Sequence, residues 1–168
     1  RVTVYYKQDV KPQKTVGDYR NMLIERLYNG ILNNRLNELT KQTDPPFLGA
    51  ASQKGDFVRT KDVYVLAAAV KNNGIERGLD ALLTEAARVR AYGFTETEFE
   101  REKKSLLRQI EQAFNERDKT ESANFAREYV GNFLNAEPIP GIESEFEMHK
   151  RLLPTITLQE VNKLAGEW

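Results

Sequence analysis

The apolar residues of this chain follow two periods, and the period changes where the expected elements change. Over residues 2–7 apolar and polar positions alternate, which is the period of a β-strand. After a connector over residues 11–14, apolar residues recur every three or four positions up to Lys41, as on one face of an α-helix. Thr15 can cap this helix, and Asp18 lies near the positive end of the helix dipole. We therefore expect a strand followed by a helix of about 25 residues.

The pair Pro45-Pro46 marks the next boundary, because proline disfavours helical geometry in the residue before it. Three strands are expected after this pair, over residues 47–52, 57–60 and 62–71. The last strand contains the run Val63–Val70, which is apolar at both odd and even positions. Such a run predicts a central strand that is covered on both faces, or one that faces a partner domain.

The residues that follow carry the periodicity of two helices. Residues 75–92 form the first, with Gly93 where a terminating glycine belongs and Phe94 as the hydrophobic contact after it. A capping box from Thr95 to Glu98 opens the second helix. The apolar positions expected to be buried are Leu79, Leu82, Leu83, Ala86 and Val89 in the first helix and Phe99, Leu106, Ile110 and Phe114 in the second.

Three further helices are expected, over residues 122–134, 142–153 and 157–165. The first of them carries the apolar residues Phe125, Tyr129, Val130 and Phe133. The last opens with a capping box from Thr157 to Glu160. One strand, one helix, two or three strands and then several helices predict a single α+β domain, with a mainly antiparallel sheet and helices packed on one face.

The composition is that of one folded domain, and it argues against several classes of partner. The 168 residues suffice for one hydrophobic core. Lys and Arg number 25, as do Asp and Glu, so the chain lacks the basic excess of a nucleic-acid-binding protein. No apolar run approaches the roughly 18 residues of a membrane span, so we expect no membrane insertion. The absence of cysteine excludes disulfides and thiol chemistry without fixing a compartment.

The chain has one histidine, His149, four positions after Glu145 on an expected helix. These two residues could formally share a metal ion. Two ligands do not make a zinc site, however. His149 is also three positions from both Phe146 and Leu152, at the edge of the apolar stripe. We therefore expect a packed or half-exposed histidine and assign no metal ligand.

Other candidate motifs also lead to no assigned site. A charge run comprises Glu98, Glu100, Glu102, Lys103 and Lys104. Paired carboxylates can do acid–base chemistry, but Glu100 and Lys104, four positions apart, favour a solvated helix face. The charged residues 115–122 favour a helix kink or junction. No glycine pattern that cradles phosphate and no Gly-x-Ser-x-Gly motif occurs. We assign no catalytic and no cofactor-binding residue.

Three segments carry a resemblance to a known family. They are Leu32–Leu39 (LNNRLNEL), Pro45–Ala50 (PPFLGA) and Arg88–Glu98 (RVRAYGFTETE). Together they resemble the pitrilysin/insulinase family of zinc metallopeptidases, the inverzincins, over nearly the whole chain. The resemblance implies a ferredoxin-like split βαβ unit with a mainly antiparallel sheet, helices on one face and extra C-terminal helices. It also implies a further strand beyond Trp168, so the sheet is expected to be incomplete here.

The chain departs from the family at the residues that do chemistry. Members bind zinc through His-x-x-Glu-His on a helix, and this motif is absent. In the family's substrate-orienting domain an Arg and a Tyr, seven positions apart, flank the turn after the first long helix. Thr40 and Phe47 stand at these positions and supply neither a guanidinium nor a hydroxyl. The resemblance thus implies that residues 1–168 are one non-catalytic domain, the second of a long multi-domain member, and a fragment of a longer polypeptide.

The resemblance also predicts a function for this fragment within the longer polypeptide, here called the parent. The parent is expected to be a zinc metalloendopeptidase whose catalytic domain holds the zinc, while the fragment alone holds no cofactor and is inactive. The fragment would complete a clamshell chamber beside the catalytic domain and help to bind a peptide or protein substrate. Alternatives are a domain of a catalytically inactive, peptidase-like scaffold or peptide-binding protein, and an unrelated α+β binding domain. Family analogy implies a periplasmic location.

Overall fold

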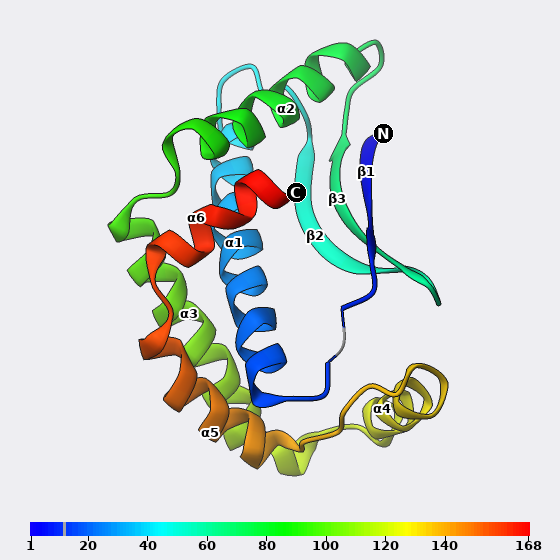
Figure 1. The fold of residues 1–168 in the computed structure, drawn as a ribbon. Helices are drawn as coiled ribbons and strands as arrows, with labels where there is room; N and C mark the ends of the chain where they lie inside the picture. The colour runs from blue at the N-terminus through cyan, green and yellow to red at the C-terminus, as the bar shows by residue number, and fades with distance from the viewer. Residues whose placement is uncertain (12) are drawn as a thin grey trace.

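The computed structural model describes residues 1–11 and 13–168, so Pro12 of the expected connector lies outside the described residues. Figure 1 shows a curved sheet beside one long helix, with shorter helices around them. The elements are β1 (Val2–Asp9), α1 (Val16–Thr40), β2 (Gly49–Val58), β3 (Lys61–Ala69), α2 (Ile75–Tyr92), α3 (Glu96–Asn115), α4 (Ser122–Asn135), α5 (Ile142–Leu152) and α6 (Leu158–Glu167), with short 3₁₀ helices at Arg117–Lys119 and Leu153–Thr155.

The sheet has the strand order β1-β3-β2, and both pairings are antiparallel. Leu66 of β3, for example, lies between Val4 of β1 and Ser52 of β2. The strands β1 and β2 therefore run parallel to each other, with α1 connecting them and β3 inserted between them. This is a split βαβ unit, and the expected α+β fold is confirmed.

The core lies between one face of the sheet, here called the inner face, and α1. Tyr64, Leu66 and Ala68 of β3 point into it. The helix α1 contributes the fully buried residues Leu23, Leu27, Ile31, Leu32 and Leu36. The helices α2, α3, α5 and α6 add to the same core from around α1 (Figure 1). No described helix combines the length and apolar character needed to cross a membrane.

The helix ends follow the sequence signals closely. Thr15, Thr95 and Thr157 each cap a helix through a reciprocal capping box. Gly93 ends α2 with a positive φ of 72°, and its N–H donates to the carbonyl of Val89 over 2.8 Å. Each of these predictions is confirmed, because capping depends on residues only a few positions apart.

Of the two or three strands expected after α1, the structure has two, and residues 47–52 and 57–60 do not form separate strands. β2 runs without interruption from Gly49 to Val58 and bends at a β-bulge between Asp56 and Val58. The polar residues in its middle look like a break in the sequence. Lys54, however, lies on the inner face, where its ammonium contacts the Glu25 carboxylate of α1 at 2.6 Å.

The apolar stripe of α2 is less buried than expected. In α2 the buried residues are Gly78, Leu82, Glu85 and Val89, whereas Leu83 is exposed. Glu85 lies on the buried face of α2, where its carboxylate contacts Arg35 and Arg88 at 3.3 and 3.1 Å. The helix α4 has its expected place in the sequence, but none of its residues is buried.

Candidate functional site

His149 lies in the interior of the molecule, with 1% of its surface exposed. Its Nδ1 is 2.8 Å from the backbone oxygen of Glu145 and 3.2 Å from the hydroxyl oxygen of Tyr19. Burial lowers the pKa of His149, so the imidazole is neutral at physiological pH. A neutral ring with its proton on Nδ1 donates to that carbonyl. The expected packed histidine is confirmed.

Glu145 lies one helical turn before His149 on α5. Burial raises the pKa of Glu145, which favours its neutral form and weakens it as a ligand for a cation. Within residues 1–11 and 13–168, no three side chains of His, Asp, Glu or Cys come together as a metal site would require. The assignment of no zinc ligand therefore stays a prediction, and metal analysis would test it.

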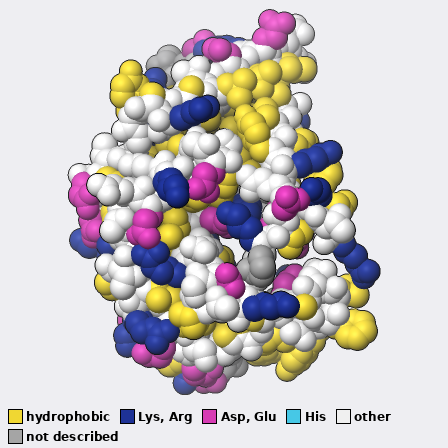
Figure 2. Space-filling model, in the orientation of Figure 1, with side chains coloured by type: hydrophobic (Ala, Val, Ile, Leu, Met, Phe, Trp, Pro, Cys, Tyr) yellow, Lys and Arg dark blue, Asp and Glu magenta, His cyan; other side chains and the backbone are white. Residues whose placement is uncertain are grey.

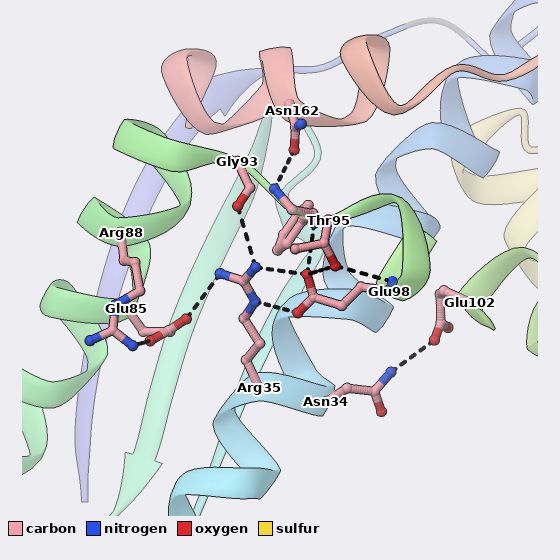
Figure 3. Close-up of polar contacts among 10 residues, drawn as sticks. Asn34, Arg35, Glu85, Arg88, Gly93, Thr95, Glu98, Glu102 and Asn162 are labelled. Carbon is pink, nitrogen blue, oxygen red and sulfur yellow. Dashed lines mark hydrogen bonds and ion pairs between the residues drawn. The ribbon is translucent and has the colours of Figure 1, made fainter. Parts of the chain in front are cut away.

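Arg35 of α1 forms the centre of a polar cluster that joins α1 to α2 and α3 (Figure 3). Its guanidinium makes a bidentate contact with Glu98, with Nε–Oε1 at 2.6 Å and Nη2–Oε2 at 2.8 Å. It also donates to Glu85 and to the backbone oxygen of Gly93, each over 3.3 Å. The guanidinium lies over the ring of Phe94 at 5.0 Å.

The electrostatics of this cluster are those of a stable ion pair. Hydrogen bonds from Arg35, with smaller contributions from Thr95, lower the pKa of Glu98 to about 2. Glu98 is thus ionised at physiological pH, and it also caps α3 through Thr95. A general acid or base needs a pKa near the working pH. The Arg35–Glu98 pair is therefore suited to holding helices together rather than to proton transfer.

The neighbours of Arg35 extend the same junction. The side-chain amide of Asn33 accepts from the backbone N–H of Ser52 and donates to its carbonyl, over 2.6 and 3.0 Å. Asn34 donates to Glu102 over 2.9 Å (Figure 3). Three consecutive residues of the LNNRLNEL segment therefore tie α1 to β2, α3 and the α2–α3 turn.

The expectation of a solvated face for the charge run was half wrong. Glu102 is buried, and Glu98 is largely covered by Arg35. Lys104 is exposed as expected, whereas Lys103 lies over Phe99 and contacts Glu100 at 2.9 Å. The partners of the two inward carboxylates lie on α1, more than 60 residues away in sequence, so spacing within the run could not reveal them.

The PPFLGA segment also has a packing role. Phe47 is 1% exposed and belongs to the core, as expected for a residue without a substrate-orienting hydroxyl. The hydroxyl of Thr40 donates to the backbone oxygen of Asn37, a bond within the last turn of α1. These two positions hold only local or core contacts.

The outer face of the sheet, opposite α1, is one candidate for an interaction surface. Tyr5 of β1 and Phe57 of β2 approach each other across β3, with ring centroids 6.1 Å apart. They shield Val63 and Val65, so β3 is buried there on both faces, as its sequence predicted.

Beyond these rings the side chains on the outer face are small. Its residues there are Ala67 and Ala69 of β3 and Ala51 of β2, of which Ala51 and Ala69 are exposed. Small side chains let another backbone approach closely. In the described structure β1 and β2 pair only with β3, so the far edge of each strand has no strand partner within that part of the chain.

A groove of about 1010 Å³ opens between the β2–β3 hairpin and the C-terminal end of α4. It is lined by side chains of both signs, including Lys54, Arg59, Asp56 and Glu137. Basic and acidic side chains are interspersed over much of the face seen in Figure 2. The mixture of charges on this face agrees with the zero net charge.

Comparisons with known proteins show which proteins this chain is similar to. No family model matches the sequence. The chain is 34% identical over 164 residues to a zinc protease PQQL-like of Arabidopsis thaliana, an alignment that covers 98% of this chain and 14% of that protein.

Two solved structures share the fold. The crystal structure of the periplasmic protease PqqL from Escherichia coli superposes with a TM-score of 0.89 at 16% identity, over 98% of this chain and 18% of that one. A predicted insulinase family protease from Yersinia pestis superposes with a TM-score of 0.86 at 12% identity, over 98% of this chain and 36% of that one. The chain thus spans about a seventh of the length of its Arabidopsis relative.

Proposed function

We propose that this chain, which is homologous to one segment of the insulinase-family zinc proteases, serves as a non-catalytic domain of a longer zinc metalloendopeptidase. One observation carries the proposal. Almost the whole chain aligns with a zinc protease, yet its 168 residues contain no His-x-x-Glu-His and its single histidine is packed in the interior. The zinc and its general base would then belong to another domain of the same polypeptide.

The domain would have two roles, which are to form part of the chamber wall and to bind peptide along its sheet. The alanine-rich part of the outer face suits close contact with the catalytic domain, and the chain would help to wall a chamber around the peptide. Within the described part of the chain, one edge of β1 and one edge of β2 have no strand partner. Each would receive an extended peptide, because strand addition needs only free backbone groups. By analogy with the E. coli neighbour, described as a periplasmic protease, we place the parent in the periplasm.

Metal analysis and a fluorogenic peptide assay test this proposal on the purified 168-residue chain and on its parent. We expect the parent to hold zinc and to lose cleavage when a chelator removes it. The 168-residue chain should hold no stoichiometric zinc and cleave nothing. About one tightly held zinc per 168-residue chain would overturn the proposal. A parent that binds peptide but holds no zinc would instead support the peptidase-like scaffold.

A further inference from the structure

Among the described residues, none covers the apolar face of the helix α4. Its five large apolar side chains are all exposed, from 46% for Phe125 to 87% for Phe133. None of the helix's fourteen residues is buried, and in Figure 1 the helix stands apart from the others. Figure 2 shows apolar side chains gathered at the lower right, where α4 lies. A cluster of this kind on a single helix marks an interaction site.

The apolar and polar residues of α4 occupy separate halves of the helix. At about 100° per residue, the arc from Phe125 to Leu134 carries every large apolar side chain. The opposite arc carries Arg127, Glu128 and the asparagines. The uncovered face contains no charged residue. Depletion of charge together with aromatic enrichment is the composition of the buried core of an interface.

The C-terminal end of α4 is fixed by local bonds and does not fray into a loop. Ala136 ends the helix in the left-handed region, and its N–H donates to the carbonyl of Asn132. The side chain of Asn132 donates to the backbone oxygen of Glu137 over 2.7 Å. Such bonds shape the helix end but cover no apolar surface. A helix of this length is marginal in water by itself, so its order needs an apolar partner.

We propose that the apolar face of α4 is the surface on which another domain of the same polypeptide docks. This inference rests on the proposed function, in which the chain is one domain of a longer protein. Two observations favour a covalently linked partner. The face is free of charge, as in permanent interfaces rather than transient ones. The relatives also have about six-sevenths of their length outside the aligned segment, which supplies such domains.

The groove beside α4 shows where the docked element would lie. Phe133 and Leu134 form one wall of the groove, and Phe57 and Val58 of β2 form the opposite wall. These four side chains are exposed, so they could be covered together by one element. The docked domain would then bridge α4 and the open end of the hairpin, and so fix α4 relative to the sheet.

Hydrogen exchange measured on the intact parent, followed by mass spectrometry, tests the inference. We expect the amides of α4 to be protected at least about tenfold over those of an unstructured peptide, because a docked helix opens rarely. Phe133→Glu should remove that protection while α1 stays protected. The matched control is Arg127→Gln on the polar arc, which should leave α4 protected. Exchange in α1 reports whether each variant has folded, and the wild-type result stands if a variant does not fold.

Three outcomes would overturn the inference. The amides of α4 could exchange freely in the wild-type parent. Their protection could depend on protein concentration, which would identify a second copy as the partner. Protection could also appear only after a peptide substrate is added. Zinc content and peptide cleavage are measured on the same samples. An active zinc enzyme with unprotected α4 refutes the docking alone, whereas protected α4 in a protein without zinc refutes only the proposed function.

Discussion

The carboxylate of Glu102 on α3 occupies the space that a side chain at position 30 of α1 would need, so Gly30 and Glu102 are mutually dependent. Glu102 is buried and accepts a hydrogen bond from Asn34 over 2.9 Å. The glycine therefore allows a close approach of α1 and α3 with a carboxylate between them. Glycine lowers the helix propensity of α1, and the hydrogen bond between Asn34 and Glu102 that it makes room for offsets this cost.

Gly30→Ala should destabilise the protein even though alanine is the better helix former. Alanine adds about 1 kcal/mol of helix propensity. Displacing the Glu102 carboxylate from Asn34 should cost about 1–3 kcal/mol, because a buried polar group loses its partner. We expect a net loss of about 1 kcal/mol in the free energy of unfolding, measured by urea denaturation.

A second variant pair checks the cause of that loss. With Glu102→Ala as background, Gly30→Ala should raise stability by about 1 kcal/mol, since the clash is gone and the propensity gain remains. If Gly30→Ala destabilises equally in both backgrounds, the contact with Glu102 is not the reason.

The Arg35–Glu98 pair should make stability depend on pH in the acid range. The pKa of Glu98 is lowered from 4.5 to about 2 in the folded protein, so the unfolded state binds the proton first as pH falls. The stabilisation is present above about pH 4.5 and is lost on acidification toward pH 2. Allowing for solvent screening at this partly exposed pair, we expect a loss of about 1–2 kcal/mol.

Glu98→Gln isolates this contribution. The variant keeps a side-chain oxygen for the helix cap but cannot titrate. Other acids, among them Glu160 beside Arg20, also have a lowered pKa and titrate in this range. The difference between wild type and Glu98→Gln in denaturation at pH 7 and pH 3 is therefore the measured quantity. A difference that does not change with pH would contradict the assignment.

Phe47→Ala should lower the stability of the parent by about 3–5 kcal/mol, because the ring is buried and its removal leaves a cavity. Leu48→Ala is the neighbouring control, since Leu48 is 61% exposed and should cost about 0.5 kcal/mol or less. Thermal unfolding measures both. A kinetic defect in Phe47→Ala with an unchanged melting temperature would show that this ring acts on substrate instead.

Ala67→Trp or Ala69→Trp on the outer face of β3 should lower kcat/KM of the parent while its zinc content stays full. A tryptophan side chain at either position would displace a domain that packs on the outer face. A displacement of about 1 Å in a catalytic site can lower the rate about a hundredfold. Ala87→Trp on the exposed side of α2 is the control, and it should leave kcat/KM unchanged. Wild-type turnover in correctly folded Ala67→Trp and Ala69→Trp proteins would show that the outer face meets no catalytic partner.

The sequence by itself determined the features that depend on near neighbours. The three capping boxes, the end of α2 at Gly93 and the period of α1 all follow from residues within one or two helical turns. The central place of β3 could also be predicted, because a strand that is apolar on both faces has to be covered on both. Local propensity and periodicity carry this information wherever tertiary contacts do not oppose it.

Only the tertiary structure decided which polar residues are buried and which apolar ones are not. Glu98 and Glu102 looked like a solvated face, because their partners Arg35 and Asn34 lie more than 60 residues away in sequence. The sequence shows that the face of α4 containing Phe133 is apolar, yet nothing in the described chain covers it. Periodicity shows that a helix face is apolar. Whether that face is buried depends on contacts with segments or domains that are distant in sequence.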